Sequence, residues 1–323
     1  MSSPIQFVIR EGGTVHFRRQ SSGGGPGAER WVLIPPLPTL GEFADWGQDR
    51  FASGPDAAFM VDHDERRILV NFSHPYAYDD WDSYRRVYLH VLRRMWPDWR
   101  VGWAYAGMEE MLHHLGLDLA EVDPPHVPAL PAHRADRLPP RRHRVKDERG
   151  GTGMHTAGDS LYAGLLTVDD GTAVRAYALG SGLPGLLASG EEILARLPEE
   201  ALCRTRRVMP LDGMHLDLPA RTGGYWTSFH DVPLDHDDRF PRWPGWTWRF
   251  WEDDHHRQID LARGAVRLPE PDLDTVLLDF AERHRHWQID PVHMRDLLLE
   301  QIAGRTEDDK YNALAALVHA MYT

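Results

Sequence analysis

The first recurring pattern in the chain is a pair of apolar runs joined at a glycine. FVIREGGTVHF begins at Phe7 and LLTVDDGTAVRAY begins at Leu165, and each places an acidic residue, glycine and threonine between its two apolar runs. Glycine readily adopts the positive φ that a tight turn requires, so both stretches predict β-hairpins. FMVDHDERRILVNFS from Phe59 and MHLDLPARTGGYWTS from Met214 predict a second hairpin in each half of the chain.

Helical spacing is clearest just after the second hairpin of the first half, where we predict an amphipathic helix over 81–95. Its apolar positions recur at steps of three and four residues: Trp81, Tyr84, Tyr88, Val91 and Met95. The helix must end before Pro97, because proline has no N–H for the next helical hydrogen bond. The corresponding stretch of the second half, DVPLDHDDRFPR, is too rich in proline and aspartate for a comparable helix.

Two capping boxes predict the starts of short helices. Thr39 is followed three residues later by Glu42, and Ser189 by Glu192. In a capping box, the hydroxyl group accepts a hydrogen bond from the first helical turn while the glutamate reaches back to the capping residue.

A tryptophan-rich stretch follows in each half, as WPDW from Trp96 and WPGW from Trp243. In a β-strand, alternate side chains share a face, so each stretch places a row of aromatic residues on one side. We expect these rows to pack into a core, because a buried Trp covers about 200 Å² of apolar surface. An exposed aromatic face would instead bind a partner. The candidate binding residues are Trp99, Trp103, Tyr105, Trp246, Trp248 and Trp251.

Four matched segments in the same order indicate an old tandem duplication. We therefore predict an α+β fold in which two diverged copies of a hairpin, helix, hairpin and Trp-rich strand unit form mainly antiparallel sheet. The first repeat spans 1–122 and the second spans 159–268. A linker rich in Pro, Arg and His connects them over 123–158, and 269–323 forms a helical segment with no counterpart in the first repeat.

Within the C-terminal segment, three helices are predicted. Leu273, Val276, Leu277 and Phe280 have helical spacing. Asp290 followed by Pro291 has the sequence of a helix start, and Thr306 begins the third helix.

Composition narrows the functional classes. The formal net charge of −13 disfavours nucleic acid as a partner, since phosphate binding depends on clustered Lys and Arg. It suits a basic protein partner. One cysteine, Cys203, excludes an intramolecular disulfide. With no signal peptide or membrane span predicted, we expect a soluble cytoplasmic protein, and the preference for Arg over Lys suggests a GC-rich bacterial genome.

Catalytic signatures are missing from the sequence: it has no nucleophile elbow, phosphate-binding loop, dinucleotide fingerprint or zinc motif, so no cofactor or metal is predicted. Two matched pairs stand out, Asp62 with Arg66 and Asp217 with Arg221. They either bind each other across a hairpin turn or face a groove between the repeats. The candidate catalytic residues for such a groove are His215, Asp217, Arg221, His230 and Asp62.

Two functional hypotheses follow. The first is a protein-binding module, an immunity or antitoxin-type inhibitor of a basic protein partner. The second is a cofactor-free enzyme with its site between the repeats. A deep cleft in which at least three of the five candidates converge would favour the enzyme. The oligomeric state is not predicted.

Overall fold

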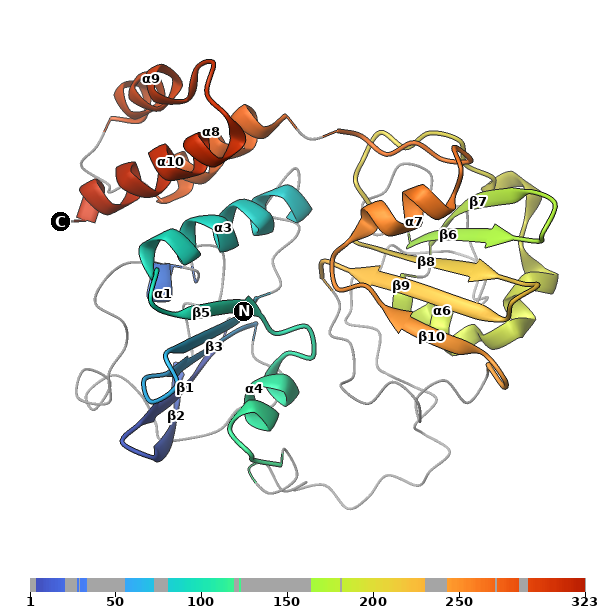
Figure 1. The fold of residues 1–323 in the computed structure, drawn as a ribbon, viewed down its shortest axis with the longest axis horizontal. Helices are drawn as coiled ribbons and strands as arrows, with labels where there is room; N and C mark the ends of the chain where they lie inside the picture. Colours follow the sequence, from blue (N-terminus) through green and yellow to red (C-terminus); the bar gives the residue numbers. More distant parts are fainter. Residues whose placement is uncertain are drawn as a thin grey trace.

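The computed structural model describes residues 4–20, 28, 30–33, 56–72, 81–118, 122, 164–180, 182–229, 243–270, 272–284 and 290–322. Within these residues the chain forms two five-stranded sheets and a C-terminal group of helices, which confirms the α+β class (Figure 1). The linker over 123–158, the Thr39 capping box, the DVPLDHDDRFPR stretch and His230 lie outside the described residues.

The two sheets have the same topology. The first contains β1 (Ile5–Glu11), β2 (Thr14–Gln20), β3 (Ala57–Asp62), β4 (Arg67–Phe72) and β5 (Arg100–Trp103) in the order β2-β1-β3-β4-β5. The second contains β6 (Gly164–Asp169), β7 (Val174–Leu179), β8 (Asp212–Asp217), β9 (Thr222–Thr227) and β10 (Thr247–Phe250) in the order β10-β9-β8-β6-β7. Each strand of the first half has a counterpart in the second, as a duplication predicts.

Each sheet is mixed, because parallel pairs join its antiparallel hairpins. The hairpins β1/β2 and β3/β4 are antiparallel, but β1 pairs with β3 and β4 pairs with β5 in parallel. In the second sheet, β6 pairs with β8 and β9 pairs with β10, also in parallel. Parallel neighbours need a crossover connection. Helix α3 (Trp81–Met95) is part of the crossover between β4 and β5, and its bounds are those predicted from the apolar spacing.

The WPDW and WPGW stretches make equivalent hydrogen bonds in the two halves. The indole N–H of Trp96 donates to the carbonyl of Val32 in α1 (Arg30–Leu33) at 2.8 Å. The indole N–H of Trp243 donates to the carbonyl of Leu187 in α6 (Leu183–Ser189), also at 2.8 Å. The first tryptophan of each stretch therefore joins the strand edge to the first helix of its half.

Helices cover both faces of each sheet. In the first half, α3 lies on one face and α4 (Met108–His114) on the other. In the second half, α6 and the 3₁₀ segments η3 (Gly190–Arg196) and η4 (Glu199–Ala201) lie on one side, and α7 (His255–Leu261) packs on β8 and β9. The Ser189 capping box does not form, because the Ser189 hydroxyl donates to the carbonyl of Gly185 at 2.7 Å.

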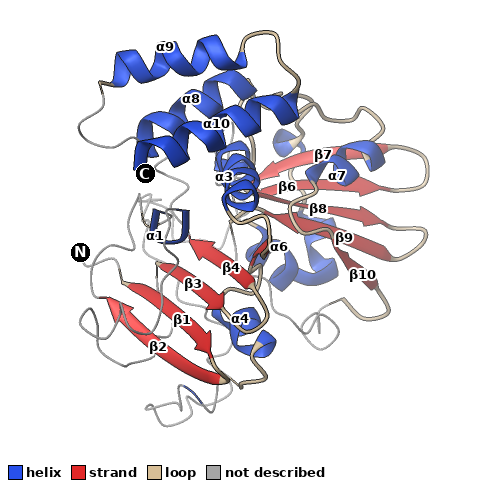
Figure 2. Ribbon diagram, turned by 60° about the vertical axis from the view of Figure 1, so that its left-hand side comes forward, coloured by secondary structure: helices blue, strands red, loops and turns tan. Residues whose placement is uncertain are grey.

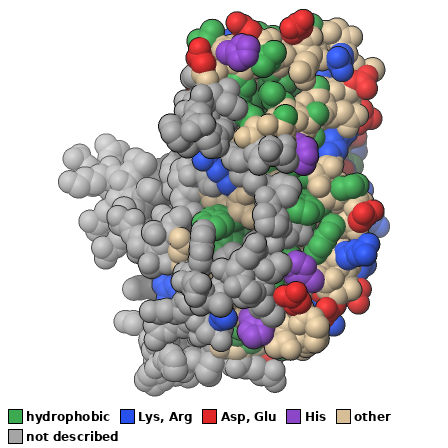
Figure 3. Space-filling view, turned by 90° about the vertical axis from the view of Figure 1, so that its left-hand side faces the viewer, with side chains coloured by type: hydrophobic (Ala, Val, Ile, Leu, Met, Phe, Trp, Pro, Cys, Tyr) green, Lys and Arg blue, Asp and Glu red, His purple; other side chains and the backbone are tan. Residues whose placement is uncertain are grey.

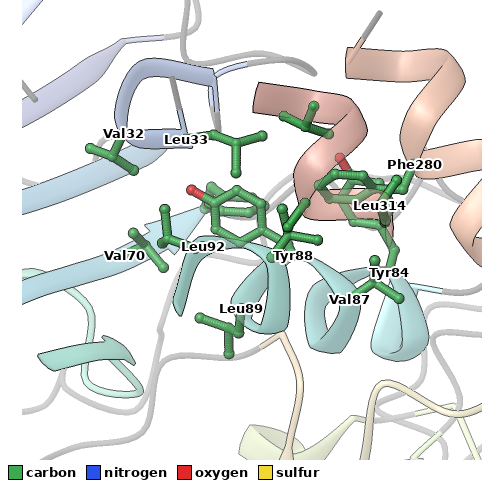
Figure 4. Packing of buried hydrophobic residues seen from close by; sticks show 14 of the residues in the cluster. Val32, Leu33, Val70, Tyr84, Val87, Tyr88, Leu89, Leu92, Phe280 and Leu314 are labelled. Atoms are coloured by element: carbon green, nitrogen blue, oxygen red, sulfur yellow. The ribbon is translucent and has the colours of Figure 1, made fainter. Parts of the chain in front are cut away.

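The C-terminal segment forms the three predicted helices, α8 (Leu273–His284), α9 (Pro291–Ile302) and α10 (Glu307–Tyr322). Asp290 caps α9 by accepting a hydrogen bond from the backbone N–H of Val292 at 3.0 Å. Figure 2 shows these helices stacked above α3. Tyr84 of α3 is directed toward Phe280 of α8 (Figure 4), and their ring centroids lie 5.4 Å apart. The segment therefore extends the core of the first half.

The two halves also contact each other directly. The indole N–H of Trp81 donates to the carbonyl of Ser228 at 2.6 Å, and the rings of Tyr105 and Phe250 meet edge to face at 5.4 Å. Among the described helices, none is long and apolar enough to cross a bilayer.

Candidate functional site

The four candidate catalytic residues that the structure describes, Asp62, His215, Asp217 and Arg221, do not converge in one place. Asp62 lies in the first half and is fully buried at the end of β3. Its carboxylate accepts hydrogen bonds from the backbone N–H groups of Asp64 and Glu65, at 3.1 and 3.0 Å. It also contacts Nε2 of His114 at 3.1 Å and Arg10 at 3.4 Å. These contacts close the β3–β4 turn, so the carboxylate of Asp62 has a structural role there.

Arg221 lies in the equivalent turn of the second half and is half exposed. Its guanidinium donates to the carbonyl of Pro244 at 2.7 Å and pairs with Glu191. Arg66, its counterpart, is exposed, and both arginines have positive φ, 49° and 50°. The described contacts include no ion pair between Asp62 and Arg66 or between Asp217 and Arg221. The matched residues share a turn geometry, in which aspartate accepts backbone N–H groups and arginine adopts the left-handed conformation.

His215 and Asp217 do share a cavity, of about 530 Å³, between the end of the second sheet and α7. We call it the His215 pocket. Its lining residues are His215, Asp217, Thr222, Gly223, Gly224, Thr247, Arg249, Trp251, Arg257, Asp260 and Leu261. Two of the four described candidate catalytic residues meet there, whereas three converging candidates would favour an enzyme.

A buried chain of hydrogen bonds orients His215. The indole N–H of Trp226, which can only donate, reaches Oε1 of Gln258 at 2.6 Å, and this fixes the orientation of the Gln258 amide. Nε2 of Gln258 then donates to the carbonyl of Met214 at 2.7 Å, and it lies 3.0 Å from both the carbonyl of Leu165 and Oγ1 of Thr167. Thr167 Oγ1 lies 2.9 Å from Nδ1 of His215, compared with 3.5 Å from its other acceptor, the carbonyl of Met214. Thr167 therefore donates its hydroxyl proton in the hydrogen bond to Nδ1, which acts as the acceptor, and the imidazole carries its own proton on Nε2.

Burial lowers the pKa of His215 below its ordinary value, against the attraction of Asp169 and Asp217. The ring is therefore neutral near pH 7. A neutral imidazole with Nδ1 occupied offers one N–H donor from Nε2.

A second cluster of charged groups lies where the halves meet. Arg85 of α3 is fully buried and pairs with Asp253 of the second half, and its guanidinium stacks over Trp103 at 4.9 Å. The hydroxyl of Tyr105 donates to Asp253 at 3.0 Å. Burial opposes ionisation of Asp253, but Arg85 and Arg86 outweigh it and lower the carboxyl pKa. Burial raises the pKa of Tyr105 well above its usual range, so the phenol stays protonated and donates.

A polar cavity of about 370 Å³ borders this cluster. It is lined by Arg67, Leu69, Arg86, Leu89, His90, Arg93, Gly102, Trp103, Tyr105, Glu110, Glu252 and Asp253. Arg86 is held by Asp82 at 3.0 Å and by the carbonyl of Asp253 at 2.7 Å. Glu110 accepts a hydrogen bond from the backbone N–H of Ala106 at 3.1 Å. Several of these polar groups therefore hold the two halves and the loop before α4 in place.

Sequence reasoning missed Arg85 and Asp253 as partners. One signal was present, because Arg85 lies four residues after Trp81 and three before Tyr88, on the apolar face of the predicted helix. A charged residue on such a face needs a buried partner. The partner lies far along the chain, so the sequence could not identify it.

The candidate aromatic residues lie against the cores. Trp103 and Trp251 are buried, and the other four are half-buried. Trp99, Trp103 and Tyr105 belong to the core of the first half, and Trp246 and Trp248 pack on that of the second. Trp251 covers the backbone of Gly224, where an added Cβ would lie 1.8 Å from the indole ring. A binding role for these residues stays a prediction.

In the described ranges, no group of three or more His, Cys, Asp or Glu side chains is arranged to hold a metal ion. Comparison of the chain with protein-family models, with curated proteins and with solved structures finds no match. Function must therefore be inferred from the pockets and surfaces of the chain itself.

Proposed function

We propose that the protein is a protein-binding module, an immunity or antitoxin-type inhibitor that masks a basic protein partner. The observation that carries this proposal is the outer face of α9, where Val292 is 64% exposed and Leu299 is 37% exposed. Asp296 and Glu300 are exposed beside them, at helical spacings of four and eight residues from Val292. The opposite face of α9 supplies Met294, Leu298 and Ile302 to the core.

Arg295 is also exposed on this face, but the two carboxylates outnumber it, and exposed aliphatic residues with a net acidic surround suit a basic partner. Apolar anchors in the centre of an interface supply affinity, while surrounding charges steer association and select partners of opposite charge. Figure 3 shows hydrophobic, acidic, basic and histidine side chains interspersed at the top of the molecule, over the C-terminal helices. The C-terminal segment also has no counterpart in the first repeat, which is consistent with an added function.

The enzyme alternative has less support from the geometry. Asp62 and Arg221 are engaged in turns, and His215 and Asp217 meet without a nucleophile such as Ser or Cys in the lining of their pocket. An inhibitor needs no such constellation. The arginine-rich composition and single cysteine suit a bacterial cytoplasmic setting for it.

Affinity purification from the native host tests the proposal. The full chain should retain a basic protein in stoichiometric amount, and the double variant Val292→Asp and Leu299→Asp should lose it. The matched control is Leu202→Asp, because Leu202 is 47% exposed but lies in the second half. The association rate of the purified partner with the chain should fall as the salt concentration is raised, because salt screens the attraction between their opposite charges. Absence of a basic protein, or equal retention by the α9 variant, would contradict the proposal.

A further inference from the structure

The two sheets differ sharply at one equivalent row of residues. In the second sheet, Thr167, His215, Gly224 and Arg249 are direct neighbours across β6, β8, β9 and β10. In the first sheet, the equivalent row across β1, β3, β4 and β5 is Val8, Met60, Leu69 and Gly102. A mainly apolar row in one copy is therefore a polar row in the other.

The helix that covers each row differs in the same way. Ala104 and Trp251 directly follow the equivalent strands β5 and β10, and their backbone N–H groups donate to the carbonyls of Val70 and Tyr225 at 2.9 and 2.8 Å. Seven residues later, α4 buries Met111 and α7 buries Gln258, both fully. Met111 joins Val8, Met60 and Leu69 in an apolar cluster. Gln258 joins the hydrogen-bond chain that orients His215.

The first half shows that this fold packs its sheet here without polar groups. A buried polar network is costly unless every member is satisfied, and an apolar core in the same place is the simpler solution for stability. Stability alone therefore does not explain the polar row of the second half. Its product is the His215 pocket, which the oriented His215 lines.

We propose that the His215 pocket binds a small monocarboxylic acid with a planar apolar body. The carboxylate would accept a hydrogen bond from Nε2–H of His215 and pair with Arg249. Among the described residues, the side chain of Arg249 makes no ion pair or hydrogen bond, and Arg249 lines the pocket from the edge strand. A guanidinium can bind a carboxylate in a bidentate manner.

Other lining residues define the remainder of the ligand. Trp251 lies flat on the bare backbone of Gly224 and provides an aromatic wall. Asp217 and Asp260 also line the pocket, and they would repel a dianion such as a phosphate monoester. The cavity of about 530 Å³ is within the size range of small-molecule sites. This site is separate from the α9 surface, so it does not depend on the proposed protein partner.

Titration with benzoate tests this inference, with benzamide as an uncharged probe of the same shape. Calorimetry should give saturable benzoate binding with a dissociation constant of about 1 mM or below, and much weaker binding of benzamide. Arg249→Gly, which introduces the residue of the first half, should weaken benzoate binding at least tenfold. Arg249→Gln serves the same purpose if the glycine variant unfolds. Arg175→Gly, on the opposite edge strand β7, should leave the affinity unchanged.

Nitrogen NMR of the imidazole gives an independent measurement of the site. In the free protein, His215 should show a protonated Nε2 and an unprotonated Nδ1, and benzoate should shift the Nε2–H resonance. Thr167→Val should remove this tautomer preference. Failure of benzoate to saturate the wild-type chain, equal affinity for benzamide, or full affinity in both Arg249 variants would overturn the proposal.

Discussion

Arg85 and Asp253 form an ion pair across the junction of the two halves, and the guanidinium of Arg85 has no exposed surface. The pair is supported by a hydrogen bond from Tyr105 to Asp253 at 3.0 Å and by the ring of Trp103 under Arg85. Such a buried charge is tolerated only while its partner remains.

Loss of the Asp253 carboxylate should therefore be strongly destabilising. We expect Asp253→Ala to lower the free energy of unfolding by about 3 kcal/mol, because buried Arg85 then keeps only its longer contact with Asp82, at 3.7 Å. The matched control is Glu192→Ala, which breaks an exposed pair with Arg196 at 2.8 Å and should cost less than about 1 kcal/mol. Urea unfolding measures both values, and similar costs for the two variants would contradict a supporting role for the junction pair.

Stability should fall in mild acid because of His255. Burial, Arg86 and His256 lower its pKa to about 3, and Arg86 donates to its Nδ1 at 3.2 Å. The unfolded chain binds a proton near pH 6.5 and the folded chain does not, so this contribution is full above pH 6.5 and is lost as the pH falls toward 3. The loss should be about 1.4 kcal/mol per pH unit within this window.

The variant His255→Gln keeps an acceptor for Arg86 but has no proton to gain. Its free energy of unfolding, measured by urea at pH 7 and pH 5, should change less than that of the wild type. His215 and His90 also have lowered pKa values and act in the same direction, whereas burial raises the pKa of Asp82, which acts in the opposite one. Parallel pH curves for variant and wild type would show that His255 is not responsible.

Gly224 should be intolerant of a side chain, because an added Cβ would lie 1.8 Å from the ring of Trp251. We expect Gly224→Ala to cost about 3 kcal/mol, since either the indole or the strand must move. Gly12→Ala is the comparison: its φ is +59° with no atom within 4 Å, so only backbone strain of about 1–2 kcal/mol is expected. Thermal or urea unfolding compares the two, and an equal or smaller cost at Gly224 would argue against close packing of Trp251 there.

Arg66 offers a stabilising substitution. Its φ of 49° is unfavourable for a residue with a Cβ, and its side chain is exposed. Arg66→Gly should raise the free energy of unfolding by about 1 kcal/mol. Arg221→Gly, at the equivalent turn, should gain less, because Arg221 loses its bonds to Pro244 and Glu191. An equal gain at both turns would mean that those bonds contribute nothing.

Local patterns in the sequence were sufficient to predict many of the helices and hairpins. The spacing from Trp81 to Met95 gave α3 its bounds, and Asp290 with Pro291 gave the start of α9. The ordered repeats predicted two units of like topology. Each of these depends on residues close in sequence, whose spacing alone determines a helix face, a cap or a hairpin.

The candidate site was less accessible to such reasoning. The pairing of β1 with β3 in parallel, the contact of Arg85 with Asp253 and the chain from Trp226 through Gln258 to His215 all join residues far apart in sequence. The sequence by itself determined the helices and strands, the repeat of the same unit in both halves, and the negative net charge. Only the tertiary structure decided which face each strand buries and which charges meet. The physical reason is that hydrogen bonds and ion pairs depend on distances of a few ångströms, which the chain sets only when it folds.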